Sequence, residues 1–186
     1  MTEAEFIAAV RRNPFNAALL ARLPALALPD CWLVSGSLFQ SVWNIRCGFP
    51  VTHGIRDYDV FYFDPDTSWE TENAVIARGR RAFEDLGITV EIRNQARVHL
   101  WYPEKFGLPY PPLARATDGI DRFLTPCAQL GLRLAARDFE LYAPSGLADV
   151  AAMVVRPNPV ANYSRERLLE KGRRWQARWP RLTIAI

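Results

Sequence analysis

The sequence predicts an α+β (α/β-like) fold in one domain. Segments whose apolar residues recur at helical spacing alternate with short apolar runs that are typical of strands. The 186 residues suffice for one domain of ordinary size, in which roughly 70% of the unfolded surface can be buried. We therefore expect a single domain over 1–186, with a core at about 31–102 and a helical and hairpin C-terminal extension at about 103–186.

The first 45 residues predict helical segments on either side of a short strand. Residues 3–23 have apolar residues at helical spacing, with an interruption near Asn13-Pro14. A buried strand is expected over 31–37, and a helix over 38–45 follows it directly. Because that helix starts right after Gly36-Ser37, its free N–H groups would face an anion.

The run 58–63, YDVFYF, is the strongest strand signal in the chain, and it follows a loop at 46–56. Residues 64–67 are expected to end the strand and to cap a helix over 68–86, which Gly87 stops.

The second half of the chain predicts shorter elements. Strands are expected at 88–92 and 98–102. The stretch 103–119 is rich in proline and glycine and is expected to form a long ordered loop or lid. The remaining predictions are a hairpin of 132–134 with 139–142, a short helix over 146–155 and a last helix capped by Ser164.

The composition is that of a globular protein, with 49% hydrophobic and 23% charged residues. No stretch approaches the ~20 apolar residues of a membrane span, and the acidic start does not resemble a signal peptide. The three cysteines, Cys31, Cys47 and Cys127, have no zinc-site spacing. We therefore expect reduced thiols and a cytoplasmic location.

Two carboxylates on one strand face are the main functional signal. Side chains alternate along a strand, so Asp57 and Asp59 share one face, and Glu91 lies in a later strand. Two or three convergent carboxylates make a site for Mg²⁺ or Mn²⁺, which then holds a triphosphate. The alternatives are that the pair lies at a wet strand end and that Glu91 faces solvent. Likewise, Gly36-Ser37 is either a phosphate contact or a turn that needs a small residue.

The order of these motifs is similar to that of the nucleotidyltransferase (DNA polymerase β-like) superfamily. In that pattern a hydrophobic residue and G[GS] precede a strand with two acidic residues, and a third acidic residue follows. More closely, RDYDVFYFD, VEIRNQARVHLWYPEKFG and APSGLADV resemble an uncharacterised, mainly bacterial family of the superfamily. This resemblance covers the chain from about Cys31 to Pro159.

The resemblance implies a mixed sheet flanked by helices and a nucleotidyltransferase activity. Asp57, Asp59 and Glu91 would be the catalytic and metal-binding residues, with Mg²⁺ or Mn²⁺, and Gly36 and Ser37 would hold the triphosphate. The enzyme would transfer a nucleoside monophosphate from an NTP to an unknown hydroxyl acceptor, a small molecule or an RNA. The 19-residue spacer before Asp57 is longer than is usual and is expected to reshape the nucleotide or acceptor pocket.

Further polar residues are weaker candidates. Arg97, His99 and Trp101 alternate with apolar residues, which indicates either a structural network or recognition of the acceptor or a phosphate. His53 and Arg56 are candidate phosphate contacts, or residues of a solvated loop.

The segment 163–181 carries seven basic and two acidic residues, a net charge of +5 in a chain whose total is +3. It is expected to be a solvated helix face, with Trp175 and Trp179 packed on the core. The alternatives to catalysis are a nucleotide-binding regulatory module without turnover, or an RNA-interacting protein that uses this basic helix.

Overall fold

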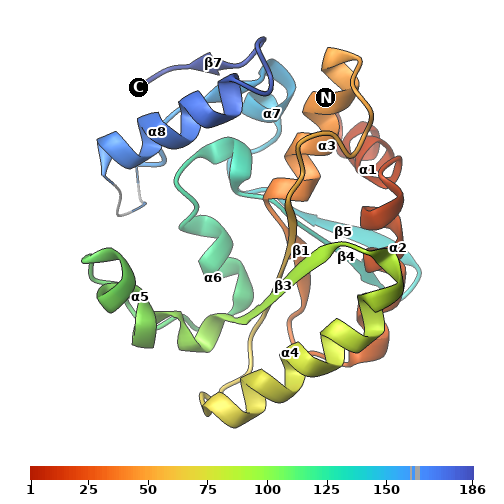
Figure 1. Cartoon of the computed structure of the whole chain (residues 1–186), viewed down its shortest axis with the longest axis vertical. Helices are drawn as coiled ribbons and strands as arrows, with labels where there is room; N and C mark the ends of the chain where they lie inside the picture. The colour runs from red at the N-terminus through yellow and green to blue at the C-terminus, as the bar shows by residue number, and fades with distance from the viewer. Residues whose placement is uncertain (160, 162–163) are drawn as a thin grey trace.

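The structure, a computed structural model, describes residues 1–159, 161 and 164–186, so residue 163 of the basic segment lies outside the described residues. A five-stranded mixed sheet with helices on both faces confirms the predicted fold class (Figure 1). Its strands are β1 (Trp32–Val34), β2 (Asp57–Tyr62), β3 (Thr89–Asn94), β4 (Gly131–Ala135) and β5 (Asp138–Tyr142), in the order β3-β2-β1-β4-β5. Within this sheet, β2 and β3 pair in parallel, and the other neighbouring strands pair antiparallel.

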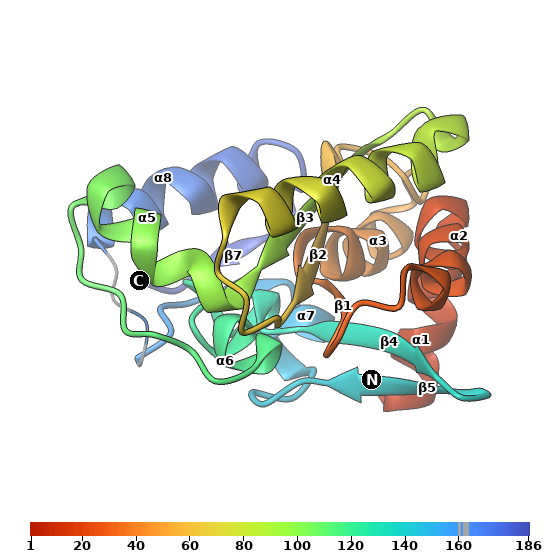
Figure 2. The ribbon, with the colours of Figure 1, turned by 90° about the horizontal axis from the view of Figure 1, so that it is seen from below.

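One face of the sheet carries the main core. Burial alternates along β2 as the sequence predicts, with Tyr58, Val60 and Tyr62 buried on this face. Asn13 separates the first two helices, because its side chain accepts the backbone N–H of Phe15 and so caps the second. Figure 2 shows α3 and α4 on the opposite side of the strands from α6. The helices over this core are α1 (Glu3–Arg11), α2 (Pro14–Arg22), α3 (Gly36–Cys47) and α4 (Trp69–Phe83).

The other face of the sheet is covered only in part. Helix α6 (Ala116–Asp121) packs Ala116 and Ile120 against Trp32 and Val34 of β1. The residues of β2 that point to this side are half-buried rather than buried. The start of β2 is therefore left open toward the C-terminal helix α8 (Arg165–Gln176).

Aromatic side chains dock α8 onto α3. The ring of Trp175 lies 5.1 Å from Phe39 and 5.8 Å from Trp43, and Trp179, just after α8, lies 5.6 Å from Trp43. The packing of both tryptophans on the core agrees with the sequence-based expectation. Aromatic pairs in these tilted and edge arrangements stabilise beyond their burial, so α8 has a fixed position.

The long spacer before β2 wraps around this C-terminal segment. Asn44 donates to the carbonyl of His53 at 2.9 Å and accepts from Trp179 Nε1 at 2.7 Å. Arg178 donates to the carbonyl of Gly54 at 3.3 Å. The spacer thus ties the end of α8 to the loop that leads into β2.

The predicted strand at 98–102 is wrong, because these residues begin a helix, α5 (Val98–Phe106). The side chain of Asn94 accepts the N–H of Ala96 and turns the chain out of β3. Val98, Tyr102 and Phe106 are then spaced by four residues and share one helix face. Gly107, with φ of 68°, ends the helix.

Several predicted boundaries also move. Strand β1 is shorter than 31–37, because α3 already begins at Gly36. The predicted loop at 103–119 shrinks to 107–115 between α5 and α6, and the predicted helix at 146–155 ends early at a short strand. The hairpin of β4 and β5 forms as expected. The remaining elements are α7 (Ala148–Ala152), β6 (Val154–Val155), β7 (Thr183–Ile184) and the 3-10 turns η1 (Leu23–Leu26), η2 (Glu84–Leu86), η3 (Gln95–Arg97) and η4 (Pro126–Ala128).

No helix among the described residues is long and apolar enough to cross a membrane.

Candidate active site

The three predicted carboxylates lie on the partly open face of the sheet. In the strand register, Asp59 lies opposite Val34 of β1 on one side and Glu91 of β3 on the other. Asp57 and Asp59 alternate with buried residues and are half-buried. Helix α3 begins at Gly36, two residues after Val34, so the start of α3 lies at the end of β1, next to the strands that carry Asp59 and Glu91.

Asp59 has the most perturbed acidic group of the site. The pKa of its carboxyl is raised to about 7, chiefly by burial and then by the like charges of Asp57 and Glu91, while Lys171 and Arg93 act in the opposite direction. Repulsion among carboxylates that are partly withdrawn from water favours a bound cation, which would remove that repulsion.

The donor set fits a divalent ion that is shared with phosphate. Among the residues that the structure describes, no group of three or more His, Cys, Asp or Glu is arranged to hold a metal ion. Glu91 forms an ion pair with Arg93 at 3.5 Å. Mg²⁺ commonly takes only one or two carboxylates, with phosphate oxygens and waters as its other ligands. Asp57 and Asp59 match that requirement.

A cavity of about 240 Å³ lies over the acidic pair, and we call it the phosphate cavity. Gly36, at the first position of α3, lines it together with the preceding Ser35. The side chain of Ser37, by contrast, is fully buried, and its hydroxyl has no hydrogen-bond partner. Ser37 can therefore meet a ligand through its backbone N–H, which is free of partners within the helix at this position. The full lining is Ser35, Gly36, Gln40, Gly54, Arg56, Asp57, Asp59, Phe123, Lys171, Arg174, Trp175 and Arg178.

Ser35 is a site residue that the sequence did not reveal. Its φ of 53° and ψ of −110° are unusual for a residue with a side chain, and its hydroxyl makes no capping bond to α3. Strained backbone of this kind is common at ligand sites.

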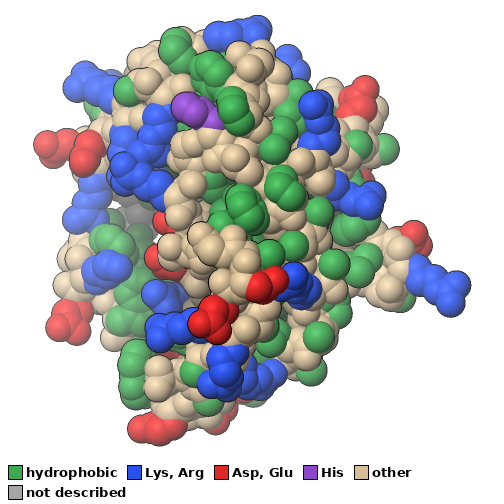
Figure 3. Space-filling model, turned by 45° about the vertical axis from the view of Figure 1, so that its right-hand side comes forward, with side chains coloured by type: hydrophobic (Ala, Val, Ile, Leu, Met, Phe, Trp, Pro, Cys, Tyr) green, Lys and Arg blue, Asp and Glu red, His purple; other side chains and the backbone are tan. Residues whose placement is uncertain are grey.

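The opposite wall of the phosphate cavity is basic. Burial lowers the pKa of Arg178, and the neighbouring charges of Arg56 and Arg174 lower it further. Lys171 likewise has a lowered pKa, from burial and then from Arg174, although Asp59 opposes this shift. Burial is the main cause of both shifts, and the repulsion between neighbouring cations adds to it. On the face seen in Figure 3, Lys and Arg side chains gather beside a hollow in which acidic side chains are visible.

The basic wall corrects the expectation of a merely solvated helix face. Lys171, Arg174 and Arg178 all line the cavity. The spacing of Arg167, Lys171 and Arg174 by four and three residues places them on one side of α8, and Arg178 follows two residues after the helix ends. This spacing was the available signal, but the sequence did not indicate which side of α8 would face the sheet. Arg173, on the same helix, is exposed and lines neither this cavity nor the next one.

The weaker candidates separate into two groups. Arg56 lines the phosphate cavity, whereas His53 packs against Phe49 in a tilted arrangement, with 4.7 Å between ring centroids. Arg97 forms an almost buried ion pair with Glu72 at 2.9 Å, which is a structural role. His99 and Trp101 lie on α5 rather than on a strand, and Trp101 lines a second cavity.

The second cavity, of about 410 Å³, adjoins the first, and we call it the aromatic cavity. Phe123 and Lys171 line both cavities. Glu91 lines the aromatic cavity and not the phosphate cavity, although it lies opposite Asp59 in the strand register.

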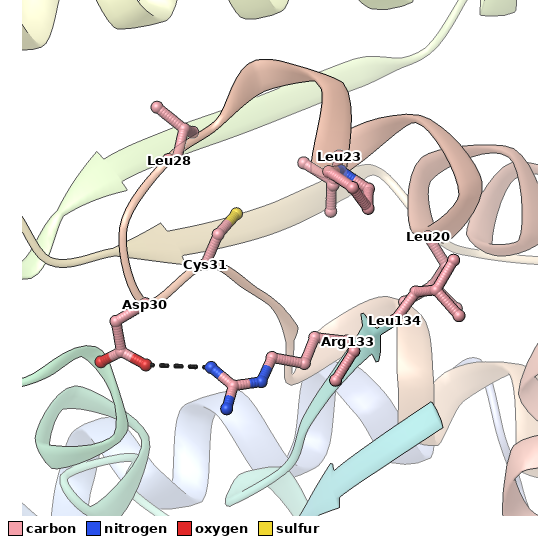
Figure 4. A pocket seen from close by; sticks show the side chains of 9 residues that line it. Leu20, Leu23, Leu28, Asp30, Cys31, Arg133 and Leu134 are labelled. Atoms are coloured by element: carbon pink, nitrogen blue, oxygen red, sulfur yellow. Dashed lines mark hydrogen bonds and ion pairs between the residues drawn. The ribbon is translucent and has the colours of Figure 1, made fainter. Parts of the chain in front are cut away.

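A third cavity, of about 260 Å³, lies between η1 and β4 (Figure 4). It is lined largely by leucines, and its charged groups, Asp30 and Arg133, form an ion pair at 3.3 Å. It contains none of the predicted site residues.

Comparisons with known proteins agree with this geometry. The sequence model of a family described as nucleotidyltransferase matches residues 21–184. A solved structure described as "The NMR structure of the protein reveals a CCA-adding enzyme head domain" is similar, with a TM-score of 0.79 and 29% sequence identity. The match covers 99% of this chain and 96% of that one. No curated protein matches the chain.

Proposed function

The chain belongs to the nucleotidyltransferase family that its residues 21–184 match, and we propose that it transfers a nucleoside monophosphate from an NTP to a hydroxyl acceptor with Mg²⁺ or Mn²⁺. One observation carries the proposal. Asp57 and Asp59 lie in one cavity with the start of α3 and with a wall of cationic side chains.

The start of α3 and the basic wall are suited to a triphosphate. Backbone N–H groups at Gly36 and Ser37 point out of the helix end, where the helix dipole also favours negative charge. Among the described residues, Arg56, Arg174 and Arg178 form no ion pair with a carboxylate, and they supply positive charge to the cavity. We therefore assign the β- and γ-phosphates to this part of the cavity.

Asp57 and Asp59 would hold the divalent ion. When bound, such an ion neutralises charge on the phosphate oxygens and brings the α-phosphate into position. Glu91, one strand further on, is the candidate base, with Lys171 beside the same carboxylates as a stabilising cation.

The transfer is a single displacement. The acceptor oxygen forms a bond to the α-phosphorus while the bond to the bridging oxygen breaks, and pyrophosphate leaves. Glu91 accepts the proton of the acceptor hydroxyl. Positioning and charge neutralisation supply most of the rate enhancement in reactions of this type. We place the reaction in the cytoplasm, where NTPs are available and the free cysteines stay reduced.

Calorimetric titration of each NTP with Mg²⁺ tests the proposal. Wild type should bind at least one NTP, and binding should weaken at least tenfold in EDTA and in Asp57→Asn/Asp59→Asn. Glu166→Gln/Glu170→Gln makes the same change in net charge on the exposed side of α8 and should bind as wild type does.

Equal NTP binding by wild type and the aspartate variant would contradict the assignment. Metal-dependent binding with no pyrophosphate release across a broad acceptor screen would instead support a regulatory nucleotide-binding role.

A further inference from the structure

The aromatic cavity is lined by neither Gly36, Asp57 nor Asp59, to which the proposed function assigns the triphosphate and the metal ion. It lies between α5, the loop 107–115 and α8, and its volume of about 410 Å³ suits one small molecule. We propose that this cavity is the acceptor site, and that the acceptor is a planar aromatic anion that carries a hydroxyl group. The proposal rests on the proposed function, because it assigns the second substrate of the same reaction.

The position of the aromatic cavity relative to the phosphate cavity is the first argument for an acceptor site. In phosphoryl transfer the attacking and leaving oxygens lie roughly in line on opposite sides of the phosphorus. The pyrophosphate leaves on the side of Gly36, next to β1, and Asp59 lies on the neighbouring strand. The attacking hydroxyl must then come from the side of β3, where Glu91 lines the aromatic cavity.

The aromatic side chains of the lining are the second argument, because they favour a planar ligand. Tyr102 lies 4.6 Å from Phe106 and 4.4 Å from Tyr110 between ring centroids, so these rings form one continuous wall. Phe61 and Phe123, which stack on each other at 5.5 Å, also line the cavity. A planar ring buries its faces best against such surfaces.

The positive charge at the cavity is the third argument, because it favours an anionic ligand. Arg122 lies 5.2 Å from the centroid of the Tyr110 ring, and Arg167 lies 5.4 Å from that of Phe106. Neither arginine is in an ion pair with a carboxylate in the part of the chain that the structure describes. These two guanidinium groups edge the aromatic wall and would recognise an anionic group of the acceptor.

Glu91 is the residue of the aromatic cavity that can accept a proton from the acceptor. It is the acidic residue of the lining and lies beside Asp59 in the strand register. A hydroxyl of the bound acceptor would lose its proton to Glu91 as its oxygen bonds to the α-phosphorus and pyrophosphate departs.

Equilibrium binding of small probes tests the proposal without turnover. The probes are AMP, CMP and salicylate, which are planar anions with hydroxyl groups, and ribose 5-phosphate, which lacks an aromatic ring. At least one planar probe should bind wild type at least tenfold more tightly than ribose 5-phosphate does. Its affinity should fall at least tenfold in Arg122→Gln/Arg167→Gln and in Phe106→Leu.

The matched control is Arg165→Gln/Arg173→Gln, which removes two exposed arginines of α8 and should change the affinity less than twofold. The Arg122→Gln/Arg167→Gln variant should keep its binding of NTP with Mg²⁺, which separates this proposal from the proposed function. Absence of NTP binding in wild type would contradict the proposed function, whatever the planar probes do.

Two results would overturn the acceptor assignment. The first result is that no planar probe binds wild type more tightly than ribose 5-phosphate does. The second is that the affinity of the planar probe for Arg122→Gln/Arg167→Gln and for Phe106→Leu stays within twofold of its affinity for wild type. A single-stranded tetranucleotide with a free 3′-hydroxyl is a further arm. Tighter binding than AMP would identify the planar anion as a nucleic-acid end, and weaker binding would identify it as a free small molecule.

Discussion

Asp59 is the residue at which folding and function compete most directly. Its carboxyl is half-buried beside two further carboxylates, and its pKa is raised to about 7, chiefly by burial. Between the ordinary pKa of 3.8 and this value, the folded chain binds more protons than the unfolded chain. The free energy of unfolding therefore decreases as pH rises through that window, and the full cost of the ionised carboxylate is present above it.

Replacing Asp59 with Asn should stabilise the metal-free protein. At pH 8 in EDTA, the free energy of unfolding of Asp59→Asn should exceed that of wild type by about 1–2 kcal/mol, after allowance for solvent screening of a half-buried group. The difference should shrink as pH falls toward 4, where the wild-type carboxyl is protonated in the folded state. Urea unfolding at several pH values measures this, and parallel curves for the two proteins would contradict the account.

The sequence predicts which side chains of β2 share a face. Period-two alternation correctly separates Asp57 and Asp59 from the buried Tyr58 and Val60. The burial of the Ser37 side chain was not readable, because it depends on where α3 begins.

At the scale of elements, α8 and the spacer before β2 support one another. Asn44 links the spacer loop to Trp179, and both residues are fully buried. Since Lys171 and Arg174 line the phosphate cavity from α8, the position of this helix sets the basic wall of the site. The extra length of the spacer therefore has a structural role in building the cavity.

Trp179→Phe tests that role. The phenyl ring keeps much of the packing, but Asn44 Oδ1 loses its donor in a buried position. An unsatisfied buried acceptor costs roughly 1–3 kcal/mol, so urea unfolding should show a loss of about that size. Trp69→Phe, at an exposed position, is the control and should change stability by less than about 0.5 kcal/mol. An equally small effect of Trp179→Phe would contradict the account.

Helix α5 shows why one element was mistaken. Residues 97–100 alternate between polar and apolar, and two aromatic residues follow, which favours a strand in isolation. The helical pattern becomes visible only over the longer span in which Val98, Tyr102 and Phe106 repeat and Gly107 follows. Because the prediction was based on the short alternating stretch, it assigned a strand. The aromatic wall, which requires a helix, was therefore not predicted.

At the scale of the whole molecule, the fold was more predictable than the site. The mixed sheet and its helices follow from local patterns, whereas the basic wall depends on contacts between α8 and α3, which are far apart in the sequence. Long-range docking of this kind leaves no local signal in one sequence. The division into a core and a C-terminal extension, and the roles of Asp57, Asp59, Glu91, Gly36 and Ser37, stay predictions.

The central claim is that a divalent ion and a triphosphate meet at Asp57 and Asp59. The most direct test is paramagnetic broadening of backbone amide NMR signals by Mn²⁺ in the presence of the NTP that binds. The account predicts that the signals of Gly36, Asp57, Asp59 and Glu91 broaden first, and that Asp57→Asn/Asp59→Asn abolishes this pattern. Broadening centred elsewhere, for example at Asp64 and Asp66 in the loop before Ser68, which caps α4 in place of the predicted residues 64–67, would contradict the claim.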